Sequence, residues 1–336
     1  MNGFRIGEVS WEGKLLLAPM AGVTDLPFRL LCKEQGADIL TTEMISAKGI
    51  YYNSKKTKDL YAIENKEHPI AIQLFGSDPD IMREVTKQIE ECDFDIVDLN
   101  MGCPVPKIVK NGEGCALMQD VSLAARVAEA VVESTKKPVT VKFRKGFNKE
   151  EETAVEFARA MENVGVAAVT VHGRTREQYY SGKADLHTIK HVKDAVRIPV
   201  VGNGDIFSPE DAKNMMEKTG CDGIMVARGA RGNPWIFRRI KEYLSSGEET
   251  PPIGYREVVE MILKHAKMQI EYKGELAGIR EMRSHIAWYT KGFPHSAVLR
   301  EKINHAESYE EMEQTILDSE FSHCYNYLQV DWEGKR

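Results

Sequence analysis

The sequence predicts an α/β fold, a (β/α)8 (TIM) barrel followed by a small all-α domain. Eight short apolar runs recur at fairly even intervals up to residue 228, and most of them are separated by amphipathic segments with helix signals. After a Ser-, Gly- and Pro-rich stretch near residue 250, only helical patterns follow. Alternating strands and helices imply parallel pairing, and eight such units imply a closed barrel; an open doubly wound sheet is the lesser alternative.

The predicted strands carry polar side chains on one face. They are LLLAPM (15–20), ILTTEM (39–44), IAIQLF (70–75), IVDLNM (96–101), VTVKFR (139–144), AVTVHG (168–173), PVVGNG (199–204) and GIMVAR (223–228). Side chains along a strand alternate between its two faces. Val139, Val141 and Phe143 therefore share a face that must meet the surrounding helices. Lys142 and Arg144 are then expected to point into the barrel.

The segments between these strands carry helix start and stop signals. The segment 78–92 is amphipathic and begins with Asp78 as an N-cap residue before a proline. The segment 208–220 begins with Ser208 followed by a proline, and it ends at Gly220, which suits a helix C-terminus. These signals support a helix after each strand.

Composition divides the chain into three parts. We expect a barrel domain over residues 1–244, a linker over 245–254 (SSGEETPPIG) and a helical domain over 255–336. Ser, Gly and Pro dominate the linker and disfavour regular structure there. The helical patterns beyond it continue to about residue 328.

Overall charge does not favour a nucleic-acid partner, but local charge does. Lys and Arg number 45 against 51 Asp and Glu, a net charge of −6, so a polyanion would need a local basic patch. Residues 261–302 carry eight Lys or Arg against four Glu, a local net charge of +4. On a helix expected over 275–291, Arg280, Arg283 and Lys291 flank an apolar face. Such charges usually mark a solvated face, yet the local inversion of sign favours RNA binding.

The cysteines and the N-terminus indicate a reducing compartment. Six cysteines are scattered without a CxxC pair, so we expect no zinc or other metal site and no disulfide framework. The N-terminus does not resemble a signal peptide, and no apolar run approaches the roughly 18 residues of a membrane span. We therefore expect a cytoplasmic protein, and a monomer.

Four of the predicted strands contribute five polar side chains to the interior of the barrel. Gln73, Asn100, Lys142, Arg144 and His172 would all lie toward the C-terminal ends of their strands. A barrel interior is normally filled by Val, Ile and Leu, and buried polar groups are costly without partners. A network that satisfies itself could explain any one of them. Five together, at the end where barrel enzymes act, indicate a binding site.

The loops after the last two strands have the features of an anion site. VGNGDIFSPED (201–211) contains two glycines before a capped helix start, and VARGARGNPWIF (226–237) contains Arg228 and two glycines. Exposed backbone amides, a helix N-terminus and an arginine together bind anions. These two loops frequently hold phosphate in barrel enzymes.

Seven blocks of sequence, in order, resemble the tRNA-dihydrouridine synthases, nearest to the bacterial B-type branch. The blocks are LAPMAGVTDLPFR (17–29), QLFGSDP (73–79), DLNMGCPVPK (98–107), VKFRKGF (142–147), VHGRTREQ (171–178), VVGNGDI (200–206) and ARGARGNPWIF (227–237). The resemblance covers about residues 14–240, and the helical part matches that family's RNA-binding domain less sharply.

The resemblance implies an FMN enzyme that reduces the C5=C6 bond of selected uridines in tRNA, with NADPH as the reductant. It implies that Gln73 and Lys142 hydrogen-bond the flavin ring, that His172 reaches toward the ring and the phosphate, and that Cys103 is the catalytic acid. The other implied cofactor residues are Ala18, Pro19 and Met20 against the flavin, and Asn203, Gly204, Asp205, Ala227 and Arg228 around the ribityl chain and phosphate.

Cys103 suits the chemistry that the resemblance implies. Hydride from flavin N5 would attack C6 of uracil, after which C5 must receive a proton. A thiol with a pKa near 8.5 is protonated at neutral pH and can supply that proton. Gly102 is expected to permit an unusual backbone angle before it. Asn100 can both donate to and accept from a uracil edge, and Arg144 and Arg174 are candidates for contacts with the base or phosphate.

Two loops mix aromatic and cationic side chains in a way that suits RNA. Residues 47–58 contain four lysines and two tyrosines, and residues 173–183 contain Arg174 with two adjacent tyrosines. Aromatic rings among cations stack on exposed bases. A uridine must leave its stack to reach a flavin, so we expect base flipping into the barrel mouth.

Three other functions would also fit a barrel, which does not discriminate among them. A dihydroorotate-dehydrogenase-like flavoprotein would act on a free pyrimidine, but it would not explain the basic helical region. A Schiff-base aldolase would use Lys142 as its nucleophile and need no flavin. A tRNA-binding protein that folds RNA without modifying it would not need Cys103.

Overall fold

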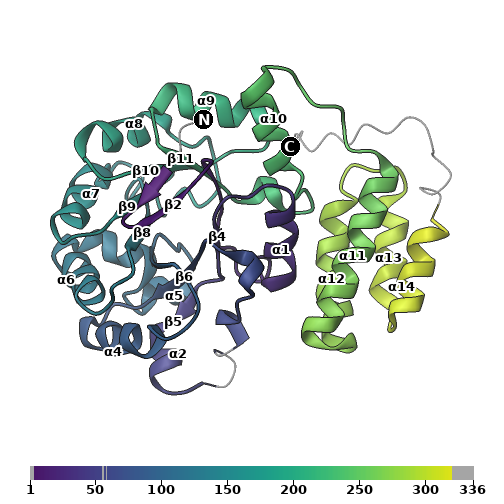
Figure 1. The fold of residues 1–336 in the computed structure, drawn as a ribbon, viewed down its shortest axis with the longest axis horizontal. Helices are drawn as coiled ribbons and strands as arrows, with labels where there is room; N and C mark the ends of the chain where they lie inside the picture. The colour runs from purple at the N-terminus through teal and green to yellow at the C-terminus, as the bar shows by residue number, and fades with distance from the viewer. Residues whose placement is uncertain (1–3, 55–56, 58, 320–336) are drawn as a thin grey trace.

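The computed structural model of the chain describes residues 4–54, 57 and 59–319. Its larger part is a ring of strands surrounded by helices, and its smaller part is a bundle of helices at one side (Figure 1). The polypeptide passes from the ring to the bundle once, after residue 246.

Eight parallel strands of the described residues form a closed barrel. Their order around the ring is β3-β11-β10-β9-β8-β7-β6-β4, and a parallel bridge between Leu16 and Ile39 joins its two ends. The expected (β/α)8 barrel is confirmed, and the open sheet is wrong. The strands are β3 (Leu15–Leu17), β4 (Leu40–Thr41), β6 (Ile70–Phe75), β7 (Ile96–Met101), β8 (Val139–Arg144), β9 (Ala168–His172), β10 (Val200–Asn203) and β11 (Gly223–Val226), with β5 (Ile45–Ser46) beside β6.

The strands separate two apolar layers, as side-chain alternation requires. Val141 and Phe143 of β8 are fully buried in the large core between the strands and the helices. Inside the barrel, at the N-terminal ends of the strands, Leu16 and Ile96 belong to a smaller apolar cluster. Ile6 joins that cluster from a hairpin of β1 (Phe4–Ile6) and β2 (Val9–Trp11). Above this cluster Asp98, Thr140 and Thr170 are also buried inside the barrel, and its C-terminal end is left for the remaining polar residues.

Helices cover the outside of the barrel, and side-chain caps fix where several of them begin. The Asp78 carboxylate accepts hydrogen bonds from two backbone amides at the start of α4 (Pro79–Ile89). Ser208 and Asp211 form a reciprocal capping box at α9 (Pro209–Thr219), which ends at Gly220 with φ of 66°. The remaining barrel helices are α1 (Leu26–Glu34), α2 (Ala47–Tyr51), α5 (Pro106–Lys110), α6 (Val121–Val132), α7 (Ala154–Asn163), α8 (Leu186–Ala195) and α10 (Ile236–Ser246).

The bundle consists of α11 (Tyr255–Lys273), α12 (Glu275–Tyr289), α13 (Ser296–His305) and α14 (Tyr309–Leu317). α10 continues to Ser246, so the first two residues of the expected 245–254 linker are helical. Residues 320–336, the last part of the expected helical domain, lie outside the described residues. No helix in the described part of the chain is long and apolar enough to cross a membrane.

The bundle packs directly against the barrel beside α1 and α10 (Figure 1). Leu31 of α1 and Trp235, just before α10, belong to the apolar core of the bundle. Gly232 has φ of 65°, and a Cβ atom there would overlap the backbone of Trp288 and Tyr289 in α12. Backbone therefore meets backbone at this point of the joint.

Candidate active site

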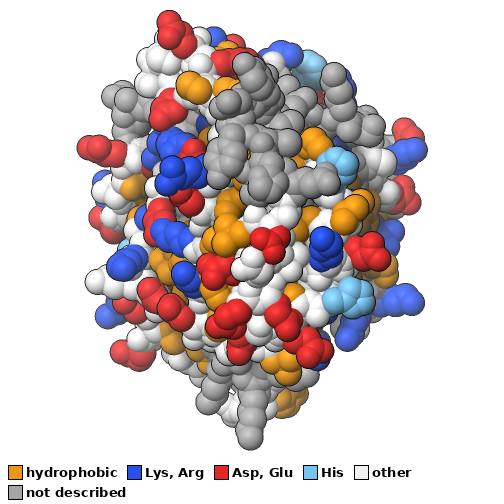
Figure 2. Space-filling model, turned by 90° about the vertical axis from the view of Figure 1, so that its right-hand side faces the viewer, with side chains coloured by type: hydrophobic (Ala, Val, Ile, Leu, Met, Phe, Trp, Pro, Cys, Tyr) orange, Lys and Arg blue, Asp and Glu red, His pale blue; other side chains and the backbone are white. Residues whose placement is uncertain are grey.

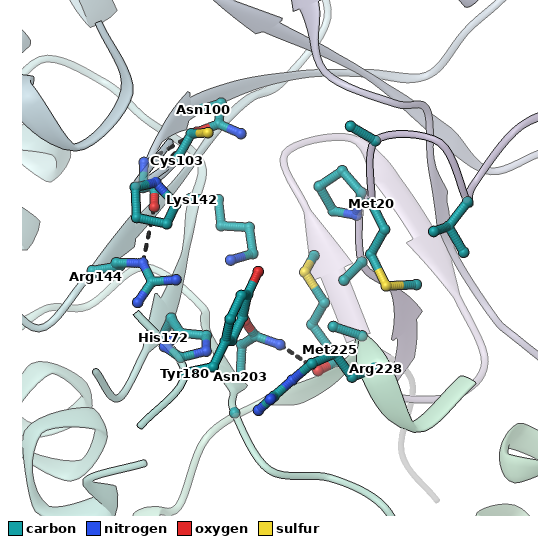
Figure 3. Close-up of a pocket in the computed structure, with 18 of the residues that line it drawn as sticks. Met20, Asn100, Cys103, Lys142, Arg144, His172, Tyr180, Asn203, Met225 and Arg228 are labelled. Carbon is teal, nitrogen blue, oxygen red and sulfur yellow. Dashed lines mark hydrogen bonds between the residues drawn. The ribbon is translucent and has the colours of Figure 1, made fainter. Parts of the chain in front are cut away.

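A cavity of about 470 Å³ opens at the C-terminal ends of the barrel strands. Its size is typical of sites that hold a cofactor or a drug-sized ligand. Figure 3 shows the polar side chains that converge on it from several strands. The sequence-predicted residues that line the cavity are Ala18, Pro19, Met20, Gln73, Asn100, Cys103, Lys142, Arg144, His172, Asn203, Gly204, Asp205, Ala227 and Arg228.

A chain of hydrogen bonds links strands β6 and β7 to the Cys103 loop. The Gln73 amide donates to the Asp98 carboxylate (2.6 Å), and the Asn100 amide donates to the Gln73 oxygen (2.8 Å). The Asn100 oxygen accepts from the backbone amides of Gly102 (3.1 Å) and Cys103 (2.9 Å). Each amide thus has a fixed orientation. The Asn100 oxygen, expected to be available to a uracil edge, is already used by the loop.

Asp98 is the buried acceptor at the first of these hydrogen bonds. It also accepts a hydrogen bond from the Thr140 hydroxyl (2.6 Å), and it is 3% exposed. Burial raises the pKa of Asp98 to about 6, against the opposing effect of its hydrogen bonds to Thr140 and Gln73. Above pH 6 the carboxylate accepts from both partners, which makes the orientation of the Gln73 amide unambiguous.

Cys103 lies at the edge of the cavity, 9% exposed, on the loop after β7. Burial raises the pKa of its thiol above the ordinary value, although Arg144 and Lys142 oppose the shift, so the thiol is protonated at neutral pH. Gly102 does not have the unusual backbone angle that we expected, since its φ is not positive. Its lack of a side chain matters for packing, because a Cβ would lie 3.2 Å from the Cα of Phe143.

Lys142 places an unpaired cation in the cavity. Among the described residues, no hydrogen bond or ion pair to its ammonium group is found, although it points into the cavity between Cys103 and His172 (Figure 3). Burial, followed by the positive charge of Arg144, lowers the pKa of Lys142 to about 8. A half-buried cation without a partner is costly, so the site fits a ligand that offers an electron-rich edge.

His172 is a neutral hydrogen-bond donor. Burial lowers its pKa well below the ordinary value, and the cations of Arg144 and Lys142 act in the same direction. Its Nδ1 accepts a hydrogen bond from the backbone amide of Arg174 (3.1 Å). The proton of the neutral ring therefore resides on Nε2, which is free to donate to a ligand.

Asp205 ties together the two arginines at the other end of the cavity. Its carboxylate contacts Arg174 (2.7 Å) and Arg228 (3.1 Å), and the positive charges lower its pKa below the ordinary value despite burial. The preceding residue, Gly204, has a positive φ of 130°. The side-chain amide of Asn203 donates to the carbonyl of Met225 (2.7 Å). This end of the cavity offers Arg228 and backbone amides to an anion.

Arg174 does not face the cavity, in contrast to the expected contact with base or phosphate. It is 1% exposed, and besides Asp205 it donates to the carbonyls of Ser181 and Gly182. Its role in this structure is to hold the loop after β9. That role could not be predicted from sequence, because Asp205 lies on another loop and no local pattern fixes how the loop after β9 folds back on Arg174.

Arg144 and Tyr180 form one wall of the cavity mouth. Arg144 donates to the carbonyls of Gly102 (3.0 Å) and Tyr179 (2.9 Å), so it joins the Cys103 loop to the loop after β9. The ring of Tyr180 lies 4.5 Å from the Arg228 guanidinium and projects across the cavity (Figure 3). Sequence reasoning placed Tyr180 in an RNA-contacting loop but missed Met225, which lies on the cavity floor without a distinguishing motif.

The two predicted RNA loops both expose their tyrosines. Tyr179 and Tyr180 are both exposed, as are Tyr51 and Tyr52 at the end of α2. Within the 47–58 loop, Lys48 pairs with Glu113 (3.2 Å), while Lys55, Lys56 and Lys58 lie outside the described residues.

The basic residues predicted on the helix over 275–291 also differ from one another. α12 ends at Tyr289, so Lys291 lies in the turn just after it. Arg280 and Lys291 are exposed, whereas Arg283 is half-buried and donates to the carbonyl of Ala306 (3.0 Å). A cavity of about 260 Å³ lies between α12 and α13 beside Arg280 and Arg283. On the side of the molecule seen in Figure 2, Lys and Arg side chains are interspersed with Asp and Glu, so any RNA contact there would use individual cations.

Comparisons with known proteins agree on one family. The sequence model of dihydrouridine synthase (Dus) matches residues 16–324. A Rickettsia bellii protein named "Probable tRNA-dihydrouridine synthase" is 42% identical over 301 residues, which are 89% of this chain and 92% of the relative. tRNA-dihydrouridine synthase B of Pseudomonas aeruginosa is 40% identical over 305 residues, 90% of this chain and 92% of the relative.

Solved structures support the barrel. Histamine dehydrogenase from Rhizobium sp. 4-9 superposes with a TM-score of 0.55 at 14% identity, over 79% of this chain. 6-Hydroxypseudooxynicotine amine oxidase from Pseudomonas geniculata N1 gives a TM-score of 0.58 over 83% of this chain, also at 14% identity. This chain spans about half of each of those longer chains, 50% and 54%. At this identity the likeness concerns the fold.

Proposed function

Since this chain belongs to the dihydrouridine synthase family, we propose that it reduces the C5=C6 bond of specific uridines in tRNA to 5,6-dihydrouridine, with FMN as cofactor and NADPH as reductant. The observation that carries the proposal is the cavity itself. It brings a protonated thiol, an unpaired lysine and an anion-binding end together at the mouth of the barrel.

The residues of the cavity fit FMN. The ammonium of Lys142 lacks a protein partner among the described residues, and the neutral His172 has a free Nε2 donor. Arg228 stands at the end of the cavity beside Gly204, where a phosphate would find a charge and backbone amides. We assign Lys142 and Gln73 to the ring, and Arg228 to the phosphate. The other cavity residues proposed for the cofactor are Ala18, Pro19, Met20, His172, Asn203, Gly204, Asp205 and Ala227.

The protein's own contribution to the chemistry is a proton and an environment. FMN, when bound and reduced by NADPH, supplies the hydride that adds to C6 of uracil. Cys103 then releases the proton of its thiol to C5, and the resulting thiolate regains a proton from solvent. Arg144 and Lys142 lie close enough to lower the cost of that thiolate. Burial raises the pKa of the Cys103 thiol and so opposes the effect of these two cations, which keeps the thiol protonated until the proton is transferred to C5.

The bundle and the barrel mouth would share the tRNA. Exposed Arg280 and Lys291 can neutralise phosphates without breaking an internal contact. Tyr179 and Tyr180 offer aromatic faces next to the cavity, which suits a uridine that has left its stack. We propose that the protein acts as a monomer in the cytoplasm. Five cysteines without disulfides among the described residues support a reducing compartment.

The test is anaerobic absorbance spectroscopy of the purified chain. Flavin absorption should disappear on addition of NADPH and return on addition of unmodified tRNA, and the product tRNA should contain dihydrouridine. Reoxidation by a free pyrimidine but not by tRNA would replace this proposal with a small-molecule dehydrogenase. A colourless protein that does not take up added FMN would refute the cofactor assignment and leave the aldolase and the RNA-folding functions.

A further inference from the structure

Three potential metal ligands meet where the bundle packs on the barrel. Asp25 caps the start of α1, His265 lies on α11, and His285 lies on α12. All three are buried, with exposures of 7%, 0% and 2%. One ligand atom from each lies within 4.8 Å of the others. Ligands around a tetrahedral ion at about 2 Å are roughly 3.4 Å apart, so a small closure would bring these atoms into coordination.

The cluster contains buried polar atoms that have no partner in the described protein. They are Nε2 of His265, Nδ1 of His285 and the side-chain oxygen of Gln269. Unsatisfied buried groups are rare in native proteins, because each loses its hydrogen bonds to water without replacement. Three at one place indicate that a bound species completes the site.

The surrounding contacts match the support that metal ligands usually receive. The other ring nitrogen of His265 lies 3.3 Å from the Tyr289 hydroxyl. One oxygen of Asp25 accepts from Gln269 (2.6 Å) and Lys273 (2.8 Å). Such partners orient a ligating imidazole or carboxylate. The other Asp25 oxygen accepts one long hydrogen bond, from the Phe28 backbone amide (3.4 Å), and keeps a lone pair for an ion.

The charges of the cluster also favour a cation. Asp25 and Glu281 each carry one negative charge, and Lys273, which contacts both, carries the one positive charge. These three side chains carry a net charge of −1, and Asp25 is the buried one of the two acids, so a cation beside Asp25 would offset a buried negative charge.

We propose that Asp25, His265 and His285 bind one divalent transition-metal ion of the Zn²⁺ class, which fastens the bundle to the barrel. Two imidazoles and a carboxylate are a ligand set that such ions prefer, and the Gln269 oxygen or water can complete it. From the sequence we expected no metal. The ligands escape sequence motifs because Asp25 lies about 240 residues before the histidines and these sit on different helices.

Equilibrium dialysis of the full chain against Zn²⁺, followed by elemental analysis, tests the proposal. The unmodified protein should bind one Zn²⁺ at this site, with histidine ligands visible by X-ray absorption spectroscopy. His265→Gln and His285→Gln should each weaken binding at least ~10-fold. His187→Gln is the matched control, because His187 is exposed on α8, and it should bind as the unmodified chain does.

The result on the unmodified chain decides the matter even if a variant does not fold. Circular dichroism and thermal unfolding show which variants are folded, whether or not the chain binds a flavin. Failure of the unmodified chain to take up Zn²⁺, or a bound ion without histidine ligands, would overturn the proposal, as would equal uptake by a folded His285→Gln variant. Flavin reduction by NADPH does not involve this cluster, so the outcome is independent of the proposed function.

Discussion

Cys103 is the residue whose chemistry can be isolated most directly. Cys103→Ser keeps the size of the side chain but replaces a thiol by a much weaker acid. Dihydrouridine formation should fall about 100-fold or more, because general acids typically contribute that much. Reduction of the flavin by NADPH should be unchanged, since this half of the reaction needs no proton at C5. Mass spectrometry of tRNA nucleosides and anaerobic stopped flow measure the two halves.

Cys92→Ser is the matched control for this experiment. Cys92 is also a free thiol of the barrel domain, but it lies outside the active-site cavity. The Cys92→Ser enzyme should reduce tRNA at the normal rate. A Cys103→Ser enzyme that does the same would remove the thiol from the mechanism and leave solvent as the source of the proton.

Lys142 should make cofactor binding depend on pH. The pKa of Lys142 is lowered to about 8, so its ammonium is charged below that pH and loses its charge as the pH rises through it. FMN affinity should therefore fall between pH 7 and pH 9, as measured by the quenching of flavin fluorescence. Lys142→Met should bind FMN about 10-fold more weakly at pH 7, the usual value of a hydrogen bond to a charged group.

Lys142→Arg distinguishes charge from shape. A guanidinium stays charged throughout this pH range, so the variant should not show the pH dependence, whatever its absolute affinity. If the dependence persisted in Lys142→Arg, another group would be responsible for it, and the assignment of Lys142 to the flavin ring would lose its support.

At the scale of the elements, strands β6, β7 and β8 act together through Asp98. Asp98→Asn would replace a charged acceptor of two hydrogen bonds by an amide with one oxygen and one NH2. Gln73 keeps an acceptor only if the new NH2 turns to the Thr140 hydroxyl, and that hydrogen bond is weaker without the charge; in the opposite orientation two donors face each other and the conflict passes to Asn100. Turnover at saturating tRNA should fall ~10-fold or more. Thr140→Val, which removes only the other hydrogen bond to Asp98, should have a smaller effect.

The buried carboxyl of Asp98 should also affect how the free energy of unfolding depends on pH. Its folded-state pKa, about 6, lies above the ordinary value near 3.9, so the folded state binds the proton more tightly. The free energy of unfolding should therefore decrease as the pH rises from 4 to 6, and Asp98→Asn should remove this part of the decrease. Chemical denaturation at pH 4 and pH 7 measures it. An Asp98→Asn enzyme with normal turnover would show that the amide chain does not position the Cys103 loop.

The sequence predicted elements whose signals are local. Alternation along VTVKFR placed Lys142 in the barrel, and Ser208 before a proline located the start of α9. The orientation of Asn100 depends in part on Gln73 of another strand, and the burial of Arg174 in part on Asp205 of another loop, so no local pattern encodes them. The end of α10 differs by two residues because a helix continues into Ser245 and Ser246 before Gly247 stops it.

At the scale of the whole molecule, the bundle should contribute charge to tRNA binding. Replacing Arg280 and Lys291 together by alanine should weaken tRNA binding. It should also reduce the slope of log affinity against log salt by about 0.7–0.9 for each phosphate that these cations neutralise. Fluorescence anisotropy at several salt concentrations measures both. Lys218→Ala is the control, because Lys218 is exposed on α9 of the barrel and should leave the slope unchanged.

Arg283 should be left intact in that experiment, because its bond to the Ala306 carbonyl supports the bundle. Flavin reduction by NADPH should be normal in the double variant, which shows that the barrel is intact. An unaltered salt slope would mean that these two cations do not touch the RNA and that tRNA uses another face of the molecule.

The close approach of Gly232 to the backbone of Trp288 and Tyr289 affects which nucleotide of a bound tRNA the enzyme can reach. At Gly232 the backbones of barrel and bundle touch without a side chain between them, so no side-chain rotation there can change the angle between the two domains. If the bundle holds the tRNA, the separation between Cys103 and the bound RNA is fixed, and a uridine is selected by its position along the tRNA. Changes at this joint would then redirect the enzyme to a different nucleotide during evolution, while every residue around the flavin stayed the same.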